Sequence, residues 1–122
     1  MKIVVGLIVV GMLAGCVVSK IVEQRPVRLS GSQVNAIEES AKYSLIDPNS
    51  AMFRNIRAKE IKREDGTQAV EFCGEVNAKN RMGGYSGFSA FKGKLEPGKP
   101  LIEFMDSSTD TYGNAAMICS TY

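Results

Sequence analysis

The sequence predicts an α+β domain in which an N-terminal helix packs on a small antiparallel β-meander that carries one disulfide. Three observations lead to this fold class. A helical pattern of apolar residues occurs early, strand-like segments joined by short turns follow it, and two cysteines, Cys73 and Cys119, lie among those segments. We expect a single domain over residues 30–122, because the chain of 122 residues is long enough for one core and too short for two.

The helix is expected over residues 30–46. Ser30 and Gln33 have the spacing of a capping box, in which each side chain bonds the other residue's backbone N–H. The apolar residues that share one helix face are Val34, Ile37, Ala41 and Leu45. Pro48 disfavours the helical conformation at Asp47 and so ends the helix, and Asp47 is then expected to cap a second, short turn.

Five strands are expected after the helix, at residues 55–63, 68–77, 88–95, 101–105 and 115–120. Glu64-Asp65-Gly66-Thr67 favours a type I′ hairpin turn between the first two, and Glu96-Pro97-Gly98-Lys99 favours a turn before the fourth. In the second strand Phe72 and Cys73 face opposite sides of the sheet. A Cys73–Cys119 bond must therefore lie on the outer face or beside a bulge.

Aromatic and methionine side chains at strand spacing are expected to form the core rather than a ligand cage. These residues are Met52, Phe53, Phe72, Phe88, Phe91 and Phe104.

Residues 1–15 form an apolar leader. The apolar run from Ile3 to Val18 has sixteen residues, whereas a helix that spans a membrane needs about 20. A basic start at Lys2, a short apolar region and small residues at its end are typical of a cleaved secretory signal, and an uncleaved membrane anchor is the weaker alternative.

Leu13-Ala14-Gly15-Cys16 resembles the lipobox of a bacterial lipoprotein signal peptide. The resemblance implies that residues 1–15 are removed and that Cys16 becomes an acylated first residue, which binds the protein to a membrane through its acyl chains. Val17, in place of aspartate, implies sorting to the outer membrane of a Gram-negative bacterium, on its periplasmic face. Residues 16–29 would then form a lipidated tether, and Val27–Leu29 could form a short strand within it.

Export would expose the two remaining cysteines to an oxidising environment. An oxidising compartment favours disulfides, and acylation of Cys16 leaves an even pair, so we expect a Cys73–Cys119 bond. A free thiol and a metal ligand are the weaker alternatives, since the chain has no histidine and no Cys-x-x-Cys spacing.

Composition limits the function further. The chain has 15 Lys and Arg and 13 Asp and Glu, and removal of the leader removes one lysine, so the net charge is close to zero. Nucleic-acid-binding proteins usually have a strongly basic surface, so no nucleic-acid partner is expected. Without histidine, Ser-His and Cys-His nucleophiles are impossible. Glu71 and Glu75 share a strand face but lie about 13 Å apart, farther than the about 5–9.5 Å of hydrolytic carboxylate pairs. We expect no enzyme activity, no metal and no cofactor.

A second resemblance covers residues 45–91. Leu45-Ile46-Asp47-Pro48-Asn49-Ser50-Ala51-Met52-Phe53-Arg54-Asn55 resembles the first block of a group of small exported bacterial and prophage proteins. Phe72-Cys73-Gly74-Glu75-Val76-Asn77-Ala78-Lys79-Asn80, with Gly83-Gly84-Tyr85-Ser86-Gly87-Phe88 after it, is similar to their second block. The group has no assigned activity, so the resemblance implies a fold unit and a compartment and no catalytic residue.

The loop of residues 77–87 is the best candidate binding surface. It combines amide side chains, two cations, an aromatic ring and glycines, and its backbone N–H groups suit an anion or a glycan. The alternative is a long hairpin connection whose glycines supply positive φ angles. The candidate residues are Asn77, Lys79, Asn80, Arg81, Gly83, Gly84, Tyr85 and Gly87.

The first strand is basic, and two interpretations of it stay open. Its cations either contact lipid phosphates or acidic glycans, or belong to a solvated edge strand that resists aggregation. The second interpretation is favoured, because acidic residues are interleaved with the basic ones. The cations are Arg54, Arg57, Lys59, Lys62 and Arg63.

Together these features predict a periplasmic, acyl-anchored binding or inhibitory module that contacts an envelope protein or glycan through residues 77–87. Exclusion of a second phage, by masking its receptor, is one concrete form of this hypothesis. The alternative is an envelope assembly accessory whose sheet edge adds to a partner strand. A third hypothesis is an enzyme that works without histidine.

Overall fold

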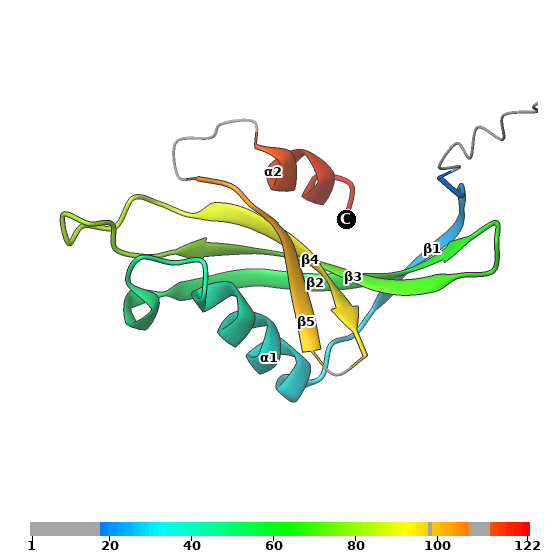
Figure 1. Cartoon of the computed structure of the whole chain (residues 1–122), viewed down its shortest axis with the longest axis horizontal. Coiled ribbons are helices and arrows are strands. Elements are labelled where there is room, and N and C mark those ends of the chain that lie inside the picture. Colours follow the sequence, from blue (N-terminus) through cyan, green and yellow to red (C-terminus); the bar gives the residue numbers. More distant parts are fainter. Residues whose placement is uncertain (1–17, 98, 108–112) are drawn as a thin grey trace, which may run out of the picture.

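The computed structural model describes residues 18–97, 99–107 and 113–122. Five strands form one antiparallel sheet whose spatial order is the order of the chain, a meander. Helix α1 covers one face of the sheet and helix α2 lies on the other (Figure 1). The elements are β1 (Ile21–Val27), α1 (Gly31–Lys42), the 3₁₀ turn η1 (Pro48–Ser50), β2 (Met52–Arg63), β3 (Gln68–Asn77), β4 (Ser89–Glu96), β5 (Lys99–Met105) and α2 (Asn114–Cys119). The predicted α+β meander with one disulfide is confirmed.

Helix α1 begins at the predicted capping box. The Gln33 N–H donates to Ser30 Oγ at 3.2 Å, and the Ser30 N–H donates to Gln33 Oε1 at 2.8 Å. The helix ends at Lys42, four residues before the predicted end. Beyond it the chain tightens, with the N–H groups of Ser44 and Leu45 bonded to carbonyls three residues back.

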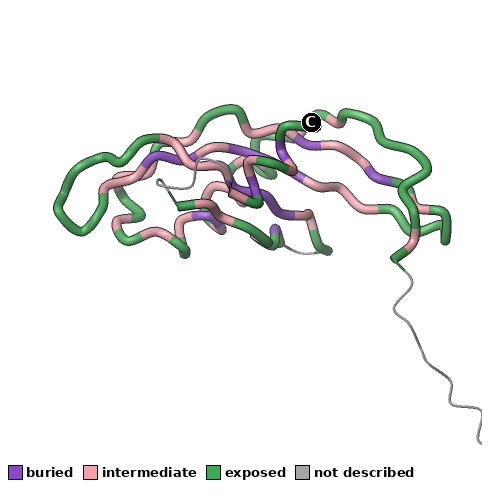
Figure 2. Tube along the Cα trace, turned by 90° about the horizontal axis from the view of Figure 1, so that it is seen from above, coloured by how far each residue is buried: buried purple, intermediate pink, exposed green. Residues whose placement is uncertain are grey.

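The core lies between α1 and the sheet. Ile37 and Ala41 of α1 are buried against Phe72, Val76 and Phe91. Phe91 meets Phe72 edge to face, with ring centroids 6.3 Å apart. Burial is concentrated in the middle of the sheet, and the hairpin ends are exposed (Figure 2).

The predicted core is right in part. Phe53, Phe72 and Phe91 belong to it, and Phe88 is half-buried. Met52 and Phe104 are exposed, so their assignment to the core was wrong. Met52 precedes the inward-facing Phe53, and Phe104 pairs with Lys92 on the opposite face, so the alternation of a strand turns both away from α1.

A β-bulge explains why β2 alternates imperfectly. Asn55 has a φ of 58°, and the pairing with β3 shifts between Arg54 and Arg57. The extra residue lets Phe53 and Ile56 both pack against the core, although three positions separate them. The strand predicted at 55–63 therefore begins three residues earlier, at Met52.

The turn between β2 and β3 lies where it was predicted but is of another type. A type I′ turn needs positive φ at both central residues, and among the described non-glycine residues Asn55 has the only positive φ. Instead, Gly66 has a φ of 86°, and its N–H donates to the Arg63 carbonyl at 3.0 Å. This is a type I turn followed by a left-handed glycine. Asp65 Oδ1 accepts from the Thr67 N–H at 2.9 Å.

The segment predicted to be a tether contains a strand. β1 pairs with β2 along Ile21–Val27 and forms one edge of the sheet, earlier in the chain than the strand considered near Val27–Leu29. Because β1 is exposed on both faces, its sequence lacks the alternation that marks a half-buried strand. An Arg25–Glu60 ion pair of 3.0 Å links it to β2.

The strand predicted at 115–120 is wrong, because these residues form most of α2. Asp106 caps this helix from outside it: its carboxylate oxygens accept from the N–H groups of Ala115 at 2.9 Å and Ala116 at 2.8 Å. A carboxylate is well placed there, since helix N-termini attract negative charge. Alanine also has the highest helix propensity, which suits the first turn.

The predicted Cys73–Cys119 disulfide is present, with a Cα–Cα distance of 5.8 Å. It lies on the sheet face opposite Phe72 and also beside the bulge of β2, since Cys73 pairs with Arg57. The bond joins α2 to the central strand across 46 residues of chain. A loop of this length corresponds to about 4 kcal/mol of stabilisation in the chain-entropy model.

Gly93 of β4 has no space for a side chain, and its substitution tests the packing. A Cβ atom at this position would meet the Leu101 carbonyl oxygen and the Phe72 ring. We expect Gly93→Ala to lower the free energy of unfolding by about 1–3 kcal/mol, measured by urea denaturation and circular dichroism. Gly84→Ala is the control, because a Cβ there would have nothing within 4 Å. Equal stability of the two variants would contradict this packing.

Candidate functional site

The connection between β3 and β4 is an ordered hairpin that extends beyond the sheet (Figure 1). Lys79 and Tyr85 pair across its stem in an isolated antiparallel bridge. At the tip, the Asn80 N–H donates to the Gly84 carbonyl at 2.9 Å, and the Gly83 N–H donates to the Asn80 carbonyl at 3.0 Å. Backbone bonds therefore define the path of the hairpin.

The two asparagine side chains hold the hairpin together. Asn80 Oδ1 accepts from the Met82 N–H at 2.9 Å and from the Gly84 N–H at 3.3 Å. Asn77 Oδ1 accepts from the Gly87 N–H at 3.1 Å. The amide oxygens predicted to serve a ligand are thus engaged within the hairpin, as in an Asx-turn.

The predicted glycines serve two purposes. Gly83 and Gly87 have φ angles of 81° and 100°, which agree with the alternative prediction of a hairpin connection. Gly84 lies outside that region of φ, and its N–H is one of the two that Asn80 binds. The glycines therefore contribute to the shape of the hairpin.

Ser50 of η1 supports the stem of the hairpin from outside. Its hydroxyl accepts from the Lys79 N–H at 2.8 Å and donates to the Asp47 carbonyl at 2.8 Å. Its carbonyl accepts from the Tyr85 hydroxyl at 2.9 Å. The expected side-chain cap by Asp47 does not form. Ser50 was not predicted to be a site residue, although its position just after Asp47-Pro48 is a signal that could have indicated it.

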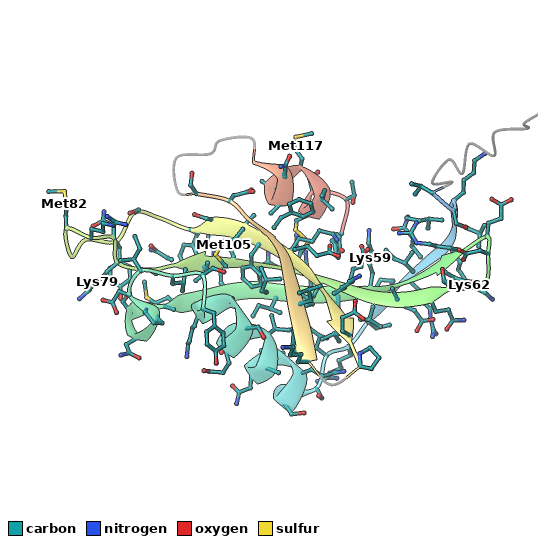
Figure 3. The ribbon with its side chains drawn as sticks, in the orientation of Figure 1. Lys59, Lys62, Lys79, Met82, Met105 and Met117 are labelled. Carbon is teal, nitrogen blue, oxygen red and sulfur yellow. A yellow bond between two sulfur atoms is a disulfide. The ribbon has the colours of Figure 1, made fainter. Side chains whose placement is uncertain are left out.

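Four side chains of the hairpin remain available to a partner. Met82 is 95% exposed at the tip, at the end of the molecule far from Lys62 (Figure 3). Arg81 beside it is exposed. Lys79 Nζ lies 5.8 Å from the centroid of the partly exposed Tyr85 ring. The structure therefore brings the predicted Lys79 and Tyr85 together, and it leaves Arg81 and Met82 exposed.

A groove of about 530 Å³ runs beside the base of the hairpin. Three segments form it: the hairpin, the chain that follows α1 and the chain that follows β5. Its apolar lining comes from Leu45, Ile46, Val76, Ala78 and Met105, and its polar lining includes Lys79, Asn80 and Asp106. This groove cannot be recognised in the sequence, because its walls are distant from one another along the chain.

The cations of β2 do not form a free basic strip, and β2 is not an edge strand as the favoured interpretation required, because β1 occupies that edge. Four of the five cations contact groups of the domain, and Lys62 is exposed. The contacts are Glu75 and the Phe88 ring for Arg54, the Cys119 carbonyl for Arg57, the Tyr122 ring for Lys59 and the Ser19 carbonyl for Arg63.

A charged cluster lies on the α2 face of the sheet. Lys92 is buried there, with its Nζ 2.6 Å from Glu103 and 3.6 Å from Glu71. The Tyr122 hydroxyl donates to Glu71 at 3.1 Å. Burial raises the pKa of Tyr122 above its ordinary value, and the charge of Glu71 raises that pKa further. Burial also lowers the pKa of Lys59, which lies 4.0 Å from the Tyr122 ring centroid.

Other side chains engage both glutamates of the second predicted strand. Glu71 is bound by Lys92 and Tyr122, and Glu75 by Arg54. Within residues 18–97, 99–107 and 113–122, no three His, Cys, Asp or Glu side chains are placed to hold a metal ion.

The anchoring residue predicted from the lipobox, Cys16, lies outside the described residues. None of the helices in the described part of the chain combines the length and the apolar character needed to cross a membrane.

Comparisons with known proteins give no family assignment. No protein-family model matches the chain, no curated protein matches it, and no solved structure matches it. The geometry of the hairpin and its groove therefore carries the functional argument.

The tip of the hairpin can be loosened by one substitution. We expect Asn80→Ala to speed hydrogen exchange of the Met82 and Gly84 amides, because both lose their acceptor, and to lower the free energy of unfolding by about 1 kcal/mol. Ser86→Ala is the control: it removes only the 3.1 Å partner of Asn80 Nδ2. Unchanged exchange in Asn80→Ala, followed by NMR, would show that the backbone alone holds the tip.

Proposed function

We propose that this protein is an acyl-anchored, non-catalytic binding module of the periplasm, and that residues 77–87 bind a partner protein of the envelope. The observation that carries this proposal is the hairpin itself. It projects from the sheet with Met82 at its tip, and internal hydrogen bonds define its shape before any partner arrives.

Rigidity supports a binding role for the hairpin. A loop that is already ordered loses little conformational entropy on association. Its affinity for a partner is therefore higher than that of a flexible loop that makes the same contacts. Asn80 fixes the tip, and Ser50 fixes the stem through Lys79 and Tyr85. The same bonds leave the exposed side chains on a defined frame.

The exposed side chains favour a protein over a glycan. Methionine, arginine and tyrosine are enriched at protein–protein interfaces, and Met82, Arg81 and Tyr85 are among the exposed residues of the hairpin. The amide oxygens that would bind sugar hydroxyls are engaged within the hairpin. The neighbouring groove, lined partly by Leu45, Ile46 and Met105, offers space for an apolar side chain of the partner.

The sheet edges argue against the assembly accessory. Each edge strand contains a proline, Pro26 in β1 and Pro100 in β5, and proline lacks the N–H that strand addition uses. β1 also carries Glu23 and Arg25, charges of the kind that keep edges from pairing. An inhibitory role, including the masking of a phage receptor, needs only a protein partner and is compatible with the hairpin as its surface.

A photo-crosslinking residue at position 82, in living cells, tests the binding surface. We expect it to capture one dominant envelope protein, and we expect the same residue at position 117 to capture none of it. Met117 is the matched control because it is an exposed methionine on α2. Adding Asn80→Ala should weaken capture from position 82. Capture of peptidoglycan would contradict the choice of a protein partner, and equal capture from both positions would contradict the hairpin as the surface.

The anchor is tested by feeding cells a clickable palmitate analogue and purifying the protein. We expect the wild-type chain to be labelled and Cys16→Ser to be unlabelled, because the thioether at Cys16 is the proposed site of acylation. The double variant Cys73→Ser, Cys119→Ser is the control and should keep its label, since these two cysteines are joined to each other. A wild-type protein without label would contradict the anchor.

A further inference from the structure

The chain just before β1 is bound to the turn between β2 and β3. The Glu64 N–H donates to the Lys20 carbonyl at 2.8 Å, and Arg63 Nη1 donates to the Ser19 carbonyl at 2.9 Å. The Asp65 N–H donates to Ser19 Oγ at 3.1 Å. Three bonds therefore attach Ser19 and Lys20 to the domain, in a segment that the sequence predicted to be a tether.

This attachment limits how far the domain can stand from an anchor at Cys16. Ser19 is three positions after Cys16, and three residue steps span at most about 11 Å in any conformation. We propose that the end of the sheet formed by Val18–Val22 and residues 62–67 lies against the surface of the bilayer. This inference rests on the proposed acylation of Cys16.

The side chains at this end suit an interfacial position. Val18 is 82% exposed and Val22 is 59% exposed, and Ile21 is also exposed. Burial of these apolar side chains in the boundary between headgroups and acyl chains is energetically favourable, and a neighbouring acyl anchor holds them close to that boundary. The occupant of this surface is therefore a lipid bilayer.

Charge contributes little to the contact. The cations at this end of the sheet are Lys20, Lys62 and Arg63, and the acids are Glu64 and Asp65. One excess positive charge gives only a weak attraction to anionic lipid. We therefore expect the contact to depend weakly on ionic strength, unlike that of a polybasic segment.

The orientation also places the hairpin. β3 has ten residues, which corresponds to about 33 Å along the strand, and the hairpin of residues 77–87 begins at its far end. That distance exceeds the Debye length of about 8–10 Å, so the hairpin lies beyond the field of the headgroups. Lys62 and Met82 mark the two ends (Figure 3).

The chain has no tryptophan, so single tryptophans can report depth. The acylated protein is placed in vesicles of phosphatidylethanolamine and phosphatidylglycerol that contain lipids brominated near the carbonyl. We expect the emission of Val22→Trp to be largely lost and that of Met82→Trp to be unchanged. Both positions are exposed, so both variants should keep the fold, which circular dichroism checks.

A longer linker is the matched control. Inserting about 20 Gly and Ser residues after Cys16, with an end-to-end distance of about 25 Å, should restore most of the emission of Val22→Trp. If Val22→Trp sediments with the vesicles but is not quenched, the inference is overturned and the anchor stands. If the acylated form cannot be obtained or does not sediment with the vesicles, the proposed function itself fails.

Discussion

The alternation of side chains along β3 is the constraint on which the rest of the structure depends. Phe72 and Val76 face α1 and form the centre of the core, whereas Cys73 faces the other way and bonds α2. Glu71 shares the face of Cys73 and binds Lys92. Because β3 pairs with both β2 and β4, a shift of one residue in its register would exchange the two faces and remove both helices from their places.

The face opposite the core shows how the sheet tolerates buried charge. Lys92 is buried, and an isolated ammonium ion there would lose several kcal/mol of hydration. Glu103 and Glu71 compensate it from the two neighbouring strands, and the Tyr122 hydroxyl binds Glu71. The cluster therefore connects β3, β4, β5 and the C-terminal residues.

Local signals predicted the parts of the fold that depend on neighbours in sequence. The Ser30 capping box and the turn at Asp65-Gly66 needed only short windows of chain, and the disulfide followed from compartment and cysteine count. β1 was not predicted at its observed position because it is exposed on both faces, and its sequence therefore does not alternate between apolar and polar residues. α2 escaped because its cap, Asp106, lies outside the helix and the helix has only six residues.

The candidate site was predicted as a segment and not as a structure. The loop of residues 77–87 was identified from its composition, but its internal bonds were not: the asparagine oxygens accept from backbone N–H groups of the loop, and Met82, which was not singled out, is 95% exposed. The groove and the support from Ser50 depend on contacts between segments far apart in the chain. Such contacts cannot be recognised from the residues of one short segment.

The bonds of Ser50 make η1 and the hairpin one structural piece, although 29 positions separate Ser50 from Lys79. Anyone who transplants the hairpin onto another scaffold must therefore carry Pro48–Ser50 with it. A graft of residues 77–87 alone would keep the Asn80 tip but lose the acceptors of the Lys79 N–H and the Tyr85 hydroxyl. Chimeras between this chain and other proteins should be cut before Asp47 rather than at the ends of the loop.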